Sequence, residues 1–375
     1  MPEDALIAGY VRTPFTAARK GALAGVRPDA LSAHVIRALM ERTGLPGDAI
    51  EDVIWGCAFP EGEQGLNIGR VSALLAGLPD SVPGVTVNRW CGSSMQAVQM
   101  AAGMIATNSG EAFVAGGVES MSRVPMMGFN LLPPPEWSRG QVTDFTNMGL
   151  TAENVAREYG LSRADQEAFA VASQAKAVAA QAAGRFDAEI APFGSEAVRD
   201  GCIRETTQDK LATLKTVFLE NGTVTAGTSS PMTDGATAVL VCSARFAEDH
   251  GLEPLARIAG FAASGCAPGL MGLGPVESSR KALARAGLGI EDIDIVELNE
   301  AFAAQSEACR RDLGIDPAKL NIDGGALAIG HPLGATGARL VGKAAMLLKR
   351  EGRSRALATQ CIGGGMGIAM ILEAV

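Results

Sequence analysis

The feature that most constrains the fold of this chain is an internal repeat. Residues 42–55 have the sequence RTGLPGDAIEDVIW, and residues 285–296 have the sequence RAGLGIEDIDIV. The tripeptide Ile-Glu-Asp thus recurs at Ile50 and Ile290, 240 positions apart. Three-residue matches also arise by chance in α/β sequences; our interpretation is that the chain contains two related halves.

The same offset relates two chemically reactive side chains. Adding 240 to the position of Cys91 leads to His331, and small residues followed by a helix-like run come after each of them. Two related halves that face each other would bring both helix N-termini toward one crevice. The helix dipoles and unpaired N–H groups there favour negative charge.

Apolar runs alternate with amphipathic stretches along the chain. The runs at 5–11, 52–58 and 112–118 are typical of buried strands, whereas 31–44 has helical periodicity and ends on a glycine, as a C-cap would. Strands that alternate with helices in this way predict α/β layers.

The middle of the chain departs from this plan. It holds a Pro- and Met-rich stretch, a helical stretch opened by Ser162 and Asp165 in a capping-box pattern, and a polar, charged segment. These features predict an inserted, loop-rich lid. The predicted parts are an N-terminal half (1–116 with 228–253), an inserted domain (117–227) and a C-terminal half (254–375).

Charge and cysteine usage exclude several classes of function. The net charge of −9 argues against non-specific binding to nucleic acid or to an anionic membrane. The seven cysteines include no Cys-x-x-Cys pair and are odd in number, which predicts free thiols in a reducing compartment and neither disulfides nor a zinc site. Because the start lacks a signal-peptide pattern and no apolar run reaches about 18 residues, we expect a cytoplasmic protein without a membrane span.

Cys91 and His331 are the candidates for nucleophile and base. A thiol at a helix N-terminus has a lowered pKa, which would activate Cys91, although a lone cysteine is more often a small buried hydrophobe. His331 lies in a Gly-rich loop and could remove the thiol proton, or it could be a turn histidine bonded to backbone. His34 and His250 fall in helical patterns, and we expect them to be structural or surface residues.

Two further polar groups follow strand-like runs. Cys361 opens CIGGGMG, whose glycines let backbone N–H groups crowd around a ligand oxygen, as an oxyanion hole needs. A dinucleotide fingerprint is excluded there because only eight residues follow Gly367. Asn299 could hold a water or donate to a carbonyl, or it could be a helix N-cap. We expect Glu300 to be structural.

Four blocks in order carry a family resemblance: NRWCGSSMQAV, NEAFAAQ, GGALAIGHPLGATGAR and CIGGGMG. Together with MGLTAENVA and TAGTSSPMTDGA, they are similar to the signature blocks of the thiolase family, and the match spans nearly the whole chain. The resemblance implies a duplicated five-layered α/β/α/β/α fold with an inserted lid that binds coenzyme A (CoA). It also implies a homodimer or a tetramer.

The resemblance further implies the chemistry. Cys91, activated by His331, would attack the 3-keto carbon of a 3-ketoacyl-CoA, and carbon–carbon cleavage would expel an acetyl-CoA enolate. His331 and a water held by Asn299 would stabilise the enolate oxygen. Cys361 would protonate the enolate and then deprotonate the incoming CoA thiol. The backbone N–H groups of Cys91 and Gly363 would hold the thioester oxygen, and one such donor contributes roughly 3 to 4 kcal/mol.

The ligand and its partners follow from the same resemblance. Ser230 and Met148 match positions that line the pantetheine channel, and we assign Arg204 to the nucleotide end of CoA. CoA is expected as a substrate, with no metal and no permanently bound cofactor. The implied partners are acyl-CoA, CoA, further copies of the chain and a hydratase/dehydrogenase subunit, with no nucleic acid.

The expected direction of the reaction depends on departures within these blocks. Biosynthetic members typically carry His-Met-Gly where this chain has Asn147-Met148-Gly149. The Gly-Ser-Ser-Met-Gln after Cys91 is most similar to bacterial fatty-acid-oxidation thiolases. We therefore expect a 3-ketoacyl-CoA thiolase of β-oxidation that degrades medium or long acyl chains. TSSP at 228–231 departs from the commoner Asn-Ala-Ser-Gly, at the pantetheine channel.

Three alternatives remain open. One is a biosynthetic acetoacetyl-CoA thiolase (acetyl-CoA acetyltransferase). Another is a ketoacyl-ACP synthase, although those enzymes typically lack the second cysteine. The third is a thiolase-like protein that binds acyl-CoA without catalysis, and the presence of Cys91, His331 and Cys361 argues against it.

Overall fold

The computed structural model describes residues 3–138 and 147–375. Residues 139–146 fall within the predicted inserted domain and, like residues 1–2, lie outside the described residues. The strands are β1 (Ala5–Arg12), β2 (Thr16–Ala17), β3 (Asp52–Gly56), β4 (Gly84–Val87), β5 (Ala112–Ser120), β6 (Thr233–Ser243), β7 (Ala256–Gly265), β8 (Ile295–Leu298), β9 (Arg355–Ile362) and β10 (Met366–Glu373).

These strands form one mixed sheet whose two parts repeat the same order. The sequence of neighbours is β4-β3-β5-β6-β1-β7-β10-β9-β8, with β2 beside β6. In the first part, β3 is parallel to β4 and β5, and β6 is antiparallel to β5 and β1. In the second part, β8 is parallel to β9, and β10 is antiparallel to β9 and β7. An isolated bridge from Val296 to Leu320 occupies the place of β4. The duplication predicted from the sequence is therefore confirmed, and a short β1–β7 pairing joins the two parts.

Helices cover both faces of this sheet. They are α1 (Pro28–Thr43), α2 (Ile68–Ala76), α3 (Ser93–Ala106), α4 (Pro135–Ser138), α5 (Met148–Glu158), α6 (Arg163–Ala182), α7 (Gln208–Ala212), α8 (Ala244–Asp249), α9 (Gly274–Ala286), α10 (Ala303–Leu313), α11 (Ala326–Ile329) and α12 (Leu333–Glu351). The predicted local signals are present. Gly44 ends α1 in the left-handed conformation, and Ser162 with Asp165 forms a capping box at α6. His34 lies within α1 and His250 follows α8.

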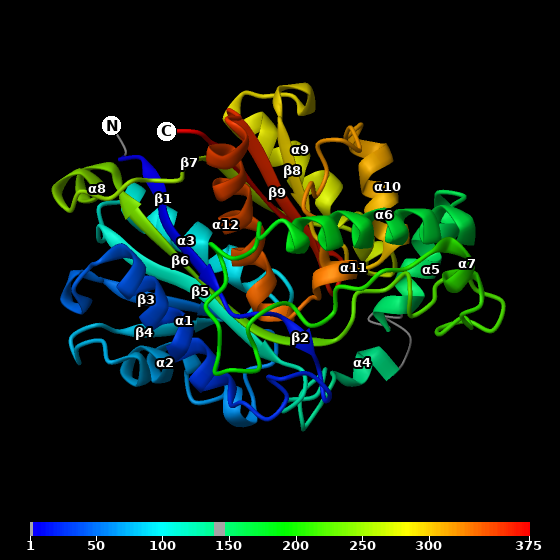
Figure 1. Cartoon of the computed structure of the whole chain (residues 1–375), viewed down its shortest axis with the longest axis horizontal. Helices are drawn as coiled ribbons and strands as arrows, with labels where there is room; N and C mark the ends of the chain where they lie inside the picture. Colours follow the sequence, from blue (N-terminus) through cyan, green and yellow to red (C-terminus); the bar gives the residue numbers. More distant parts are fainter. Residues whose placement is uncertain (1–2, 139–146) are drawn as a thin grey trace.

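The layers follow from what each helix contacts. α3 and α12 pack against each other between the two parts of the sheet, and the largest apolar core joins them to strands of both parts (Figure 1). α1 and α2 cover the outer face of the first part, and α9 and α10 cover the outer face of the second. This arrangement is the expected α/β/α/β/α order, with α3 and α12 as the shared central layer.

The segment between β5 and β6 lies beside the second part of the sheet. Its helices α5 and α6 pack on α10, and α6 also contacts α11 (Figure 1). Buried ion pairs from Arg12 on β1 to Glu189 and Asp200 tie the same segment to the first part. Since β5 continues to Ser120, the sheet extends past the predicted domain boundary at 116/117. The division into three domains stays a prediction.

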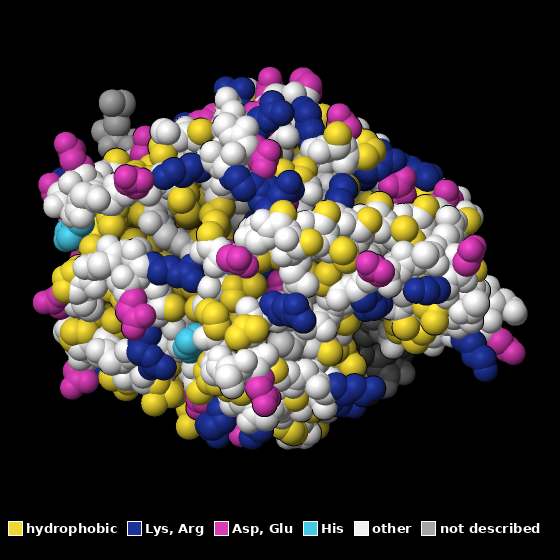
Figure 2. Space-filling model, in the orientation of Figure 1, with side chains coloured by type: hydrophobic (Ala, Val, Ile, Leu, Met, Phe, Trp, Pro, Cys, Tyr) yellow, Lys and Arg dark blue, Asp and Glu magenta, His cyan; other side chains and the backbone are white. Residues whose placement is uncertain are grey.

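Charged side chains are distributed over the surface. On the face in Figure 2, Lys and Arg side chains are interspersed with Asp and Glu, and several of the basic ones lie over the upper centre of the view. Within residues 3–138 and 147–375, no helix combines the length and the apolar character needed to cross a bilayer.

Candidate active site

Cys91 and His331 occupy matching places at the starts of the two central helices. Cys91 lies two residues before α3, and His331 lies two residues before α12. Leu333, in the first turn of α12, belongs to a small apolar cluster against which Cys91 packs. The repeat therefore brings the thiol and the imidazole from opposite halves to one place.

Hydrogen bonds fix the orientation of the His331 ring. Its Nδ1 lies 2.7 Å from the hydroxyl of Thr336, and that hydroxyl is 3.0 Å from the Pro332 carbonyl, to which it donates. Because a hydroxyl has one hydrogen, it accepts from Nδ1–H, which leaves the lone pair on Nε2. Burial lowers the pKa of His331 to about 3, so the ring is neutral.

Cys91 is held in a partly exposed loop of strained backbone. Trp90, the residue before it, has a φ of 42°, and the side chain of Gln360 donates to the Cys91 carbonyl. Burial raises the pKa of the Cys91 thiol to about 11, although the N–H of Gly363 favours the thiolate and the charge of Glu119 opposes it. Cys91 therefore rests as a neutral thiol that needs a base.

The expected lowering of the Cys91 pKa by the start of α3 is wrong, for two physical reasons. Burial outweighs the favourable contacts of the thiolate. In addition, the first N–H groups of the helix region are already used, since Gly92 donates to the Arg89 carbonyl and Ser93 to the Trp90 carbonyl. The N–H groups that reach the sulfur are those of Gly363, in the other half, and of Cys91 itself.

Cys361 and Gly363 lie at the turn from β9 to β10, close to Cys91. Cys361 is 1% exposed, and burial raises the pKa of its thiol well above the ordinary value. A Cβ placed on Gly363 would lie 3.3 Å from the Trp90 ring and 3.6 Å from the sulfur of Met148. Met148 packs in the same apolar cluster as Cys361. The structure thus brings these predicted residues together.

Asn299 follows β8 and faces His331. Its side-chain nitrogen lies 3.3 Å from His331 Nε2, and its Oδ1 is buried with no hydrogen-bond partner among the described residues. The alternative that Asn299 is a helix N-cap is wrong, because α10 is preceded by Phe302 in that position. Glu300 is structural, as expected, since its carboxylate accepts from Ser173 and Asn321.

Ser230 and Arg204 differ in their distance from this group. The N–H of Ser230 donates to the Ala301 carbonyl at 2.9 Å, which places Ser230 beside the loop that carries Asn299. Arg204 is exposed on the segment after Cys202, and its guanidinium donates to the Cys202 carbonyl. The assignment of Arg204 to the nucleotide end of CoA stays a prediction.

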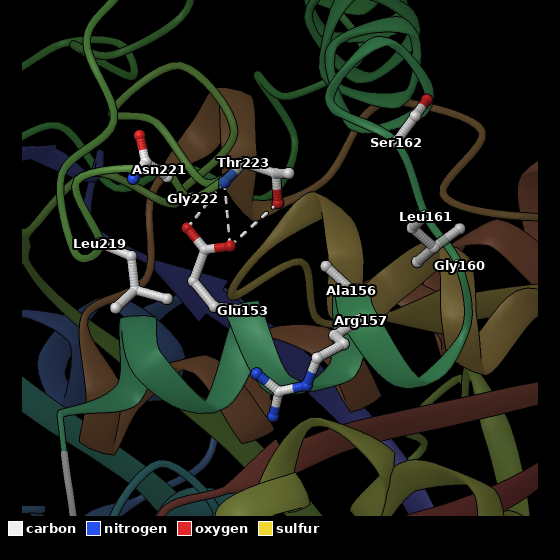
Figure 3. A pocket seen from close by; sticks show the side chains of 10 residues that line it. All are labelled: Glu153, Ala156, Arg157, Gly160, Leu161, Ser162, Leu219, Asn221, Gly222 and Thr223. Carbon is white, nitrogen blue, oxygen red and sulfur yellow. Dashed lines mark hydrogen bonds between the residues drawn. The ribbon is translucent and has the colours of Figure 1, made fainter.

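A buried carboxylate fixes the chain that leads to Ser230. Glu153, on α5, accepts hydrogen bonds from the N–H group and the hydroxyl of Thr223 (Figure 3). It also accepts from the N–H of Val224. A cavity of about 340 Å³ lies beside this contact, at the C-terminal end of α5. It contains none of the predicted site residues. We therefore interpret Glu153 as the residue whose hydrogen bonds link MGLTAENVA to TAGTSSPMTDGA, two of the blocks that are similar to thiolase blocks.

Sequence reasoning missed three residues of this site. Thr336 stands five positions after His331, and a hydroxyl one turn into the following helix is a signal that could have been used. Gln360 and Glu119 reach the site from strands β9 and β5, and their positions in the sequence contain no such signal. No group of three His, Cys, Asp or Glu side chains suited to a metal ion occurs in the part of the chain that the structure describes.

Two family models match the chain along nearly its full length. The thiolase N-terminal domain matches residues 5–245, and the thiolase C-terminal domain matches residues 252–374. The chain therefore belongs to the thiolase family of acyltransferases.

Curated relatives narrow this class. The chain is 46% identical over 385 residues to a 3-ketoacyl-CoA thiolase of Colwellia psychrerythraea, covering 99% of this chain and 100% of the relative. It is 44% identical over 388 residues to a 3-ketoacyl-CoA thiolase of Bacillus subtilis, covering 99% of each. It is 47% identical over 392 residues to a 3-ketoacyl-CoA thiolase of Shigella boydii, covering both chains completely.

Proposed function

We propose that this protein is a 3-ketoacyl-CoA thiolase, which uses CoA to cleave a 3-ketoacyl-CoA into acetyl-CoA and a shortened acyl-CoA. The observation that carries the proposal is geometric: His331 Nδ1–H is bonded to Thr336, which leaves the Nε2 lone pair on the side of Asn299, and His331 stands at the start of α12 as Cys91 stands at the start of α3. Full-length similarity to proteins of that name supports the same substrate class.

The first half of the reaction forms an acyl-enzyme. His331 Nε2 takes the proton of Cys91, and the thiolate attacks the 3-keto carbon of the substrate. The bond between carbons 2 and 3 then breaks, and its electron pair leaves as an acetyl-CoA enolate. Asn299, with its unpartnered Oδ1, is suited to hold a water at the enolate oxygen.

The second half releases both products. Cys361 gives its proton to the enolate, acetyl-CoA departs, and the Cys361 thiolate removes the proton of the incoming CoA thiol. The CoA thiolate attacks the acyl-enzyme and expels Cys91 as a thiolate, which recovers its proton from His331. A high pKa at Cys361 suits this role, because the group must hold its proton until the enolate forms.

Backbone groups and the inserted segment would bind the rest of the substrate. The N–H groups of Cys91 and Gly363 are assigned to the thioester oxygen. Gly364 and Gly365 have φ values of 77° and 80°, a conformation that side chains disfavour, and this turn presents the backbone of Gly363 beside Cys91. Ser230 and Met148 are assigned to the pantetheine arm.

The test is CoA-dependent cleavage of acetoacetyl-CoA and of 3-ketohexadecanoyl-CoA, with Cys91→Ala as the control. We expect faster cleavage of the long substrate and no cleavage by the variant. Cleavage of acetoacetyl-CoA alone would favour the biosynthetic thiolase instead. If the folded wild-type protein cleaves neither substrate but binds CoA, the non-catalytic alternative replaces the proposal.

We also propose that the protein assembles through the free edge of its sheet. Among the described residues β4 pairs with β3 alone, and all four of its residues are only half-buried. Leu66, in the loop bonded to β4 through Asn67, is 92% exposed and has a φ of 55°. An exposed edge beside a strained, exposed apolar residue fits a second copy of the chain.

The test is the molar mass in light scattering. Leu66→Asp is expected to yield monomers, whereas the control Val375→Asp is not. An unchanged mass for Leu66→Asp would contradict assembly through this edge.

Location and a larger assembly stay predictions. The bacterial origin of the relatives fits the expected cytoplasmic location. The hydratase/dehydrogenase partner is tested by co-purification from the native organism, in which a stoichiometric second subunit is the expected result.

A further inference from the structure

A buried carboxylate below the candidate active site joins the two halves of the protein. Glu119, at the end of β5, is 1% exposed. Its Oε2 accepts from the N–H groups of Ala58 and Gly334, each at 2.9 Å, and its Oε1 accepts from the side chain of Gln64 at 2.7 Å. Gln64 is itself fixed, because its own oxygen accepts from the N–H of Ser120. Glu119 and Ala58 belong to the N-terminal half, whereas Gly334 belongs to α12.

The contact with Gly334 replaces a helix cap. The residue before α12, Pro332, provides no side-chain cap, and Gly334 is the second residue of the helix, whose N–H a cap would normally bind. A Cβ on Gly334 would lie 2.6 Å from the Val118 carbonyl and 2.9 Å from Glu119 Oε2. The first turn of α12 therefore packs directly on the ends of β3 and β5, and the Glu119 carboxylate lies between them.

We propose that Glu119 is a positioning residue for the reaction: its carboxylate holds the first turn of α12, and with it His331, beside Cys91. His331 directly precedes this turn, so a displacement of Gly334 moves the imidazole. Cys91 packs on Ala58, Met121 and Leu333, which flank the groups that Glu119 contacts. The effect on catalysis rests on the proposed function, whereas the effect on position and charge does not.

The environment of Glu119 fits an ionised carboxylate. Burial raises its pKa, and the N–H donors act in the opposite direction. Among the residues that the structure describes, each hydrogen bond to its oxygens is donated by the partner, from the N–H groups of Ala58 and Gly334, the Gln64 amide and the Cys57 thiol at 3.9 Å.

The charge of Glu119 has a second consequence for Cys91. The ionisable groups around that thiol are Glu119 on β5, the neutral His331 before α12 and the protonated Cys361 on β9. Cys91 packs on Ala58, whose N–H donates to Glu119, so the carboxylate lies near the thiol, and its negative charge acts together with burial to keep Cys91 protonated. A substitution that removes the charge of Glu119 and keeps the length of its side chain should therefore make Cys91 more reactive toward alkylation at a given pH.

Two variants separate reach from charge. Glu119→Asp keeps the charge but is one methylene shorter, so it cannot reach Ala58 and Gly334 together. Glu119→Gln keeps the length and removes the charge. Glu167→Gln is the matched control, because Glu167 is also a buried glutamate but lies on α6 and pairs with Arg163. The measurements are kcat and KM for cleavage, the pH profile of Cys91 alkylation by iodoacetamide, and the crystal structure of Glu119→Asp.

Different results are expected for the two variants. Glu119→Asp should displace the first turn of α12 and lower kcat by about 10- to 100-fold with KM unchanged, because a shift of about 1 Å at a reacting group has that effect. Its alkylation profile should stay in place. Glu119→Gln should move the alkylation profile to lower pH, and Glu167→Gln should change neither property.

Clear results would overturn the proposal. It fails if α12 is unmoved and kcat is unchanged in Glu119→Asp, or if the alkylation profile of Glu119→Gln coincides with that of the wild type. Should Glu119→Gln fail to fold, Glu119→Asp remains decisive. If the wild type cleaves no 3-ketoacyl-CoA, the proposed function fails, while the crystal structure and the alkylation profile still test Glu119.

Discussion

Thr336→Val is the sharpest test of how His331 is held. The substitution keeps the shape of the side chain and removes the hydroxyl that accepts from His331 Nδ1–H at 2.7 Å. Thr336 is 1% exposed, so no water can readily take the place of the lost acceptor. The ring then has a buried, unsatisfied donor, and the tautomer with Nε2–H, which cannot act as the base, becomes relatively more favourable.

The expected magnitude follows from that unsatisfied donor. A buried polar group without a partner costs about 1–3 kcal/mol. Since each 1.36 kcal/mol corresponds to a tenfold change in rate, kcat should fall about 5- to 160-fold. KM should change little, because the hydroxyl of Thr336 is bonded to His331 and Pro332, whereas Ser230 is bonded to Ala301 and Met148 packs in the cluster that contains Cys361.

The assay is steady-state cleavage of a 3-ketoacyl-CoA by wild type, Thr336→Val and Thr336→Ser. The serine variant retains a hydroxyl at the same place and should keep most of the activity, which separates the hydrogen bond from packing. Thermal unfolding of all three proteins controls for loss of fold. A kcat for Thr336→Val within twofold of the wild type would refute the argument that this bond sets the tautomer.

Two further predictions concern stability. Burial alone would raise the pKa of Asp323, but hydrogen bonds and charges of Arg350 and Lys343 lower it from 3.8 to about 2. The ionised carboxylate therefore stabilises the folded state by roughly 2 kcal/mol. This stabilisation is present above pH 3.8 and is lost as the pH falls through 2. Urea unfolding should therefore show Asp323→Asn to be less stable than the wild type at pH 5 and by less at pH 3; a constant difference would contradict this. Gly117→Ala places a Cβ 2.2 Å from a carbonyl oxygen of α12 and should lower the free energy of unfolding by about 1–3 kcal/mol. Gly103 lies within α3 with open space where a Cβ would be, so Gly103→Ala should raise the free energy of unfolding by up to about 1 kcal/mol. Equal effects of Gly117→Ala and Gly103→Ala would contradict the close approach of α12 to Gly117.

Local signals in the sequence predicted much of the fold. The glycine at position 44 ends α1 and the capping box at Ser162 starts α6, because both signals act within a few residues. The repeat predicted the matching places of Cys91 and His331, since two related halves carry the same helix start at the same point. The family resemblance supplied the other site residues, of which Gly363, Met148 and Asn299 lie close to the two thiols or to His331.

Effects that depend on distant contacts were not predictable in this way. The thiol pKa was expected to fall because the sequence shows a helix start but not the desolvation of the Cys91 thiol by its surroundings. Glu119 and Gln360 act on the site from strands of opposite halves, through partners more than 200 residues away along the chain. The exposed position of Arg204 likewise depends on how the inserted segment folds over α6.

The order of strands also determines how the protein can fold during its synthesis. β1 (residues 5–12) is made first, yet its neighbours β6 and β7 begin at residues 233 and 256. At about 5–20 residues per second, the ribosome needs roughly 10–45 seconds to reach β6 after β1 has been made. Throughout that time β1 has both edges unpaired and β5 lacks a neighbour on one side, so the nascent chain exposes strand edges that can aggregate. Completion of the first half of the sheet in the cell is therefore timed by translation of the inserted segment.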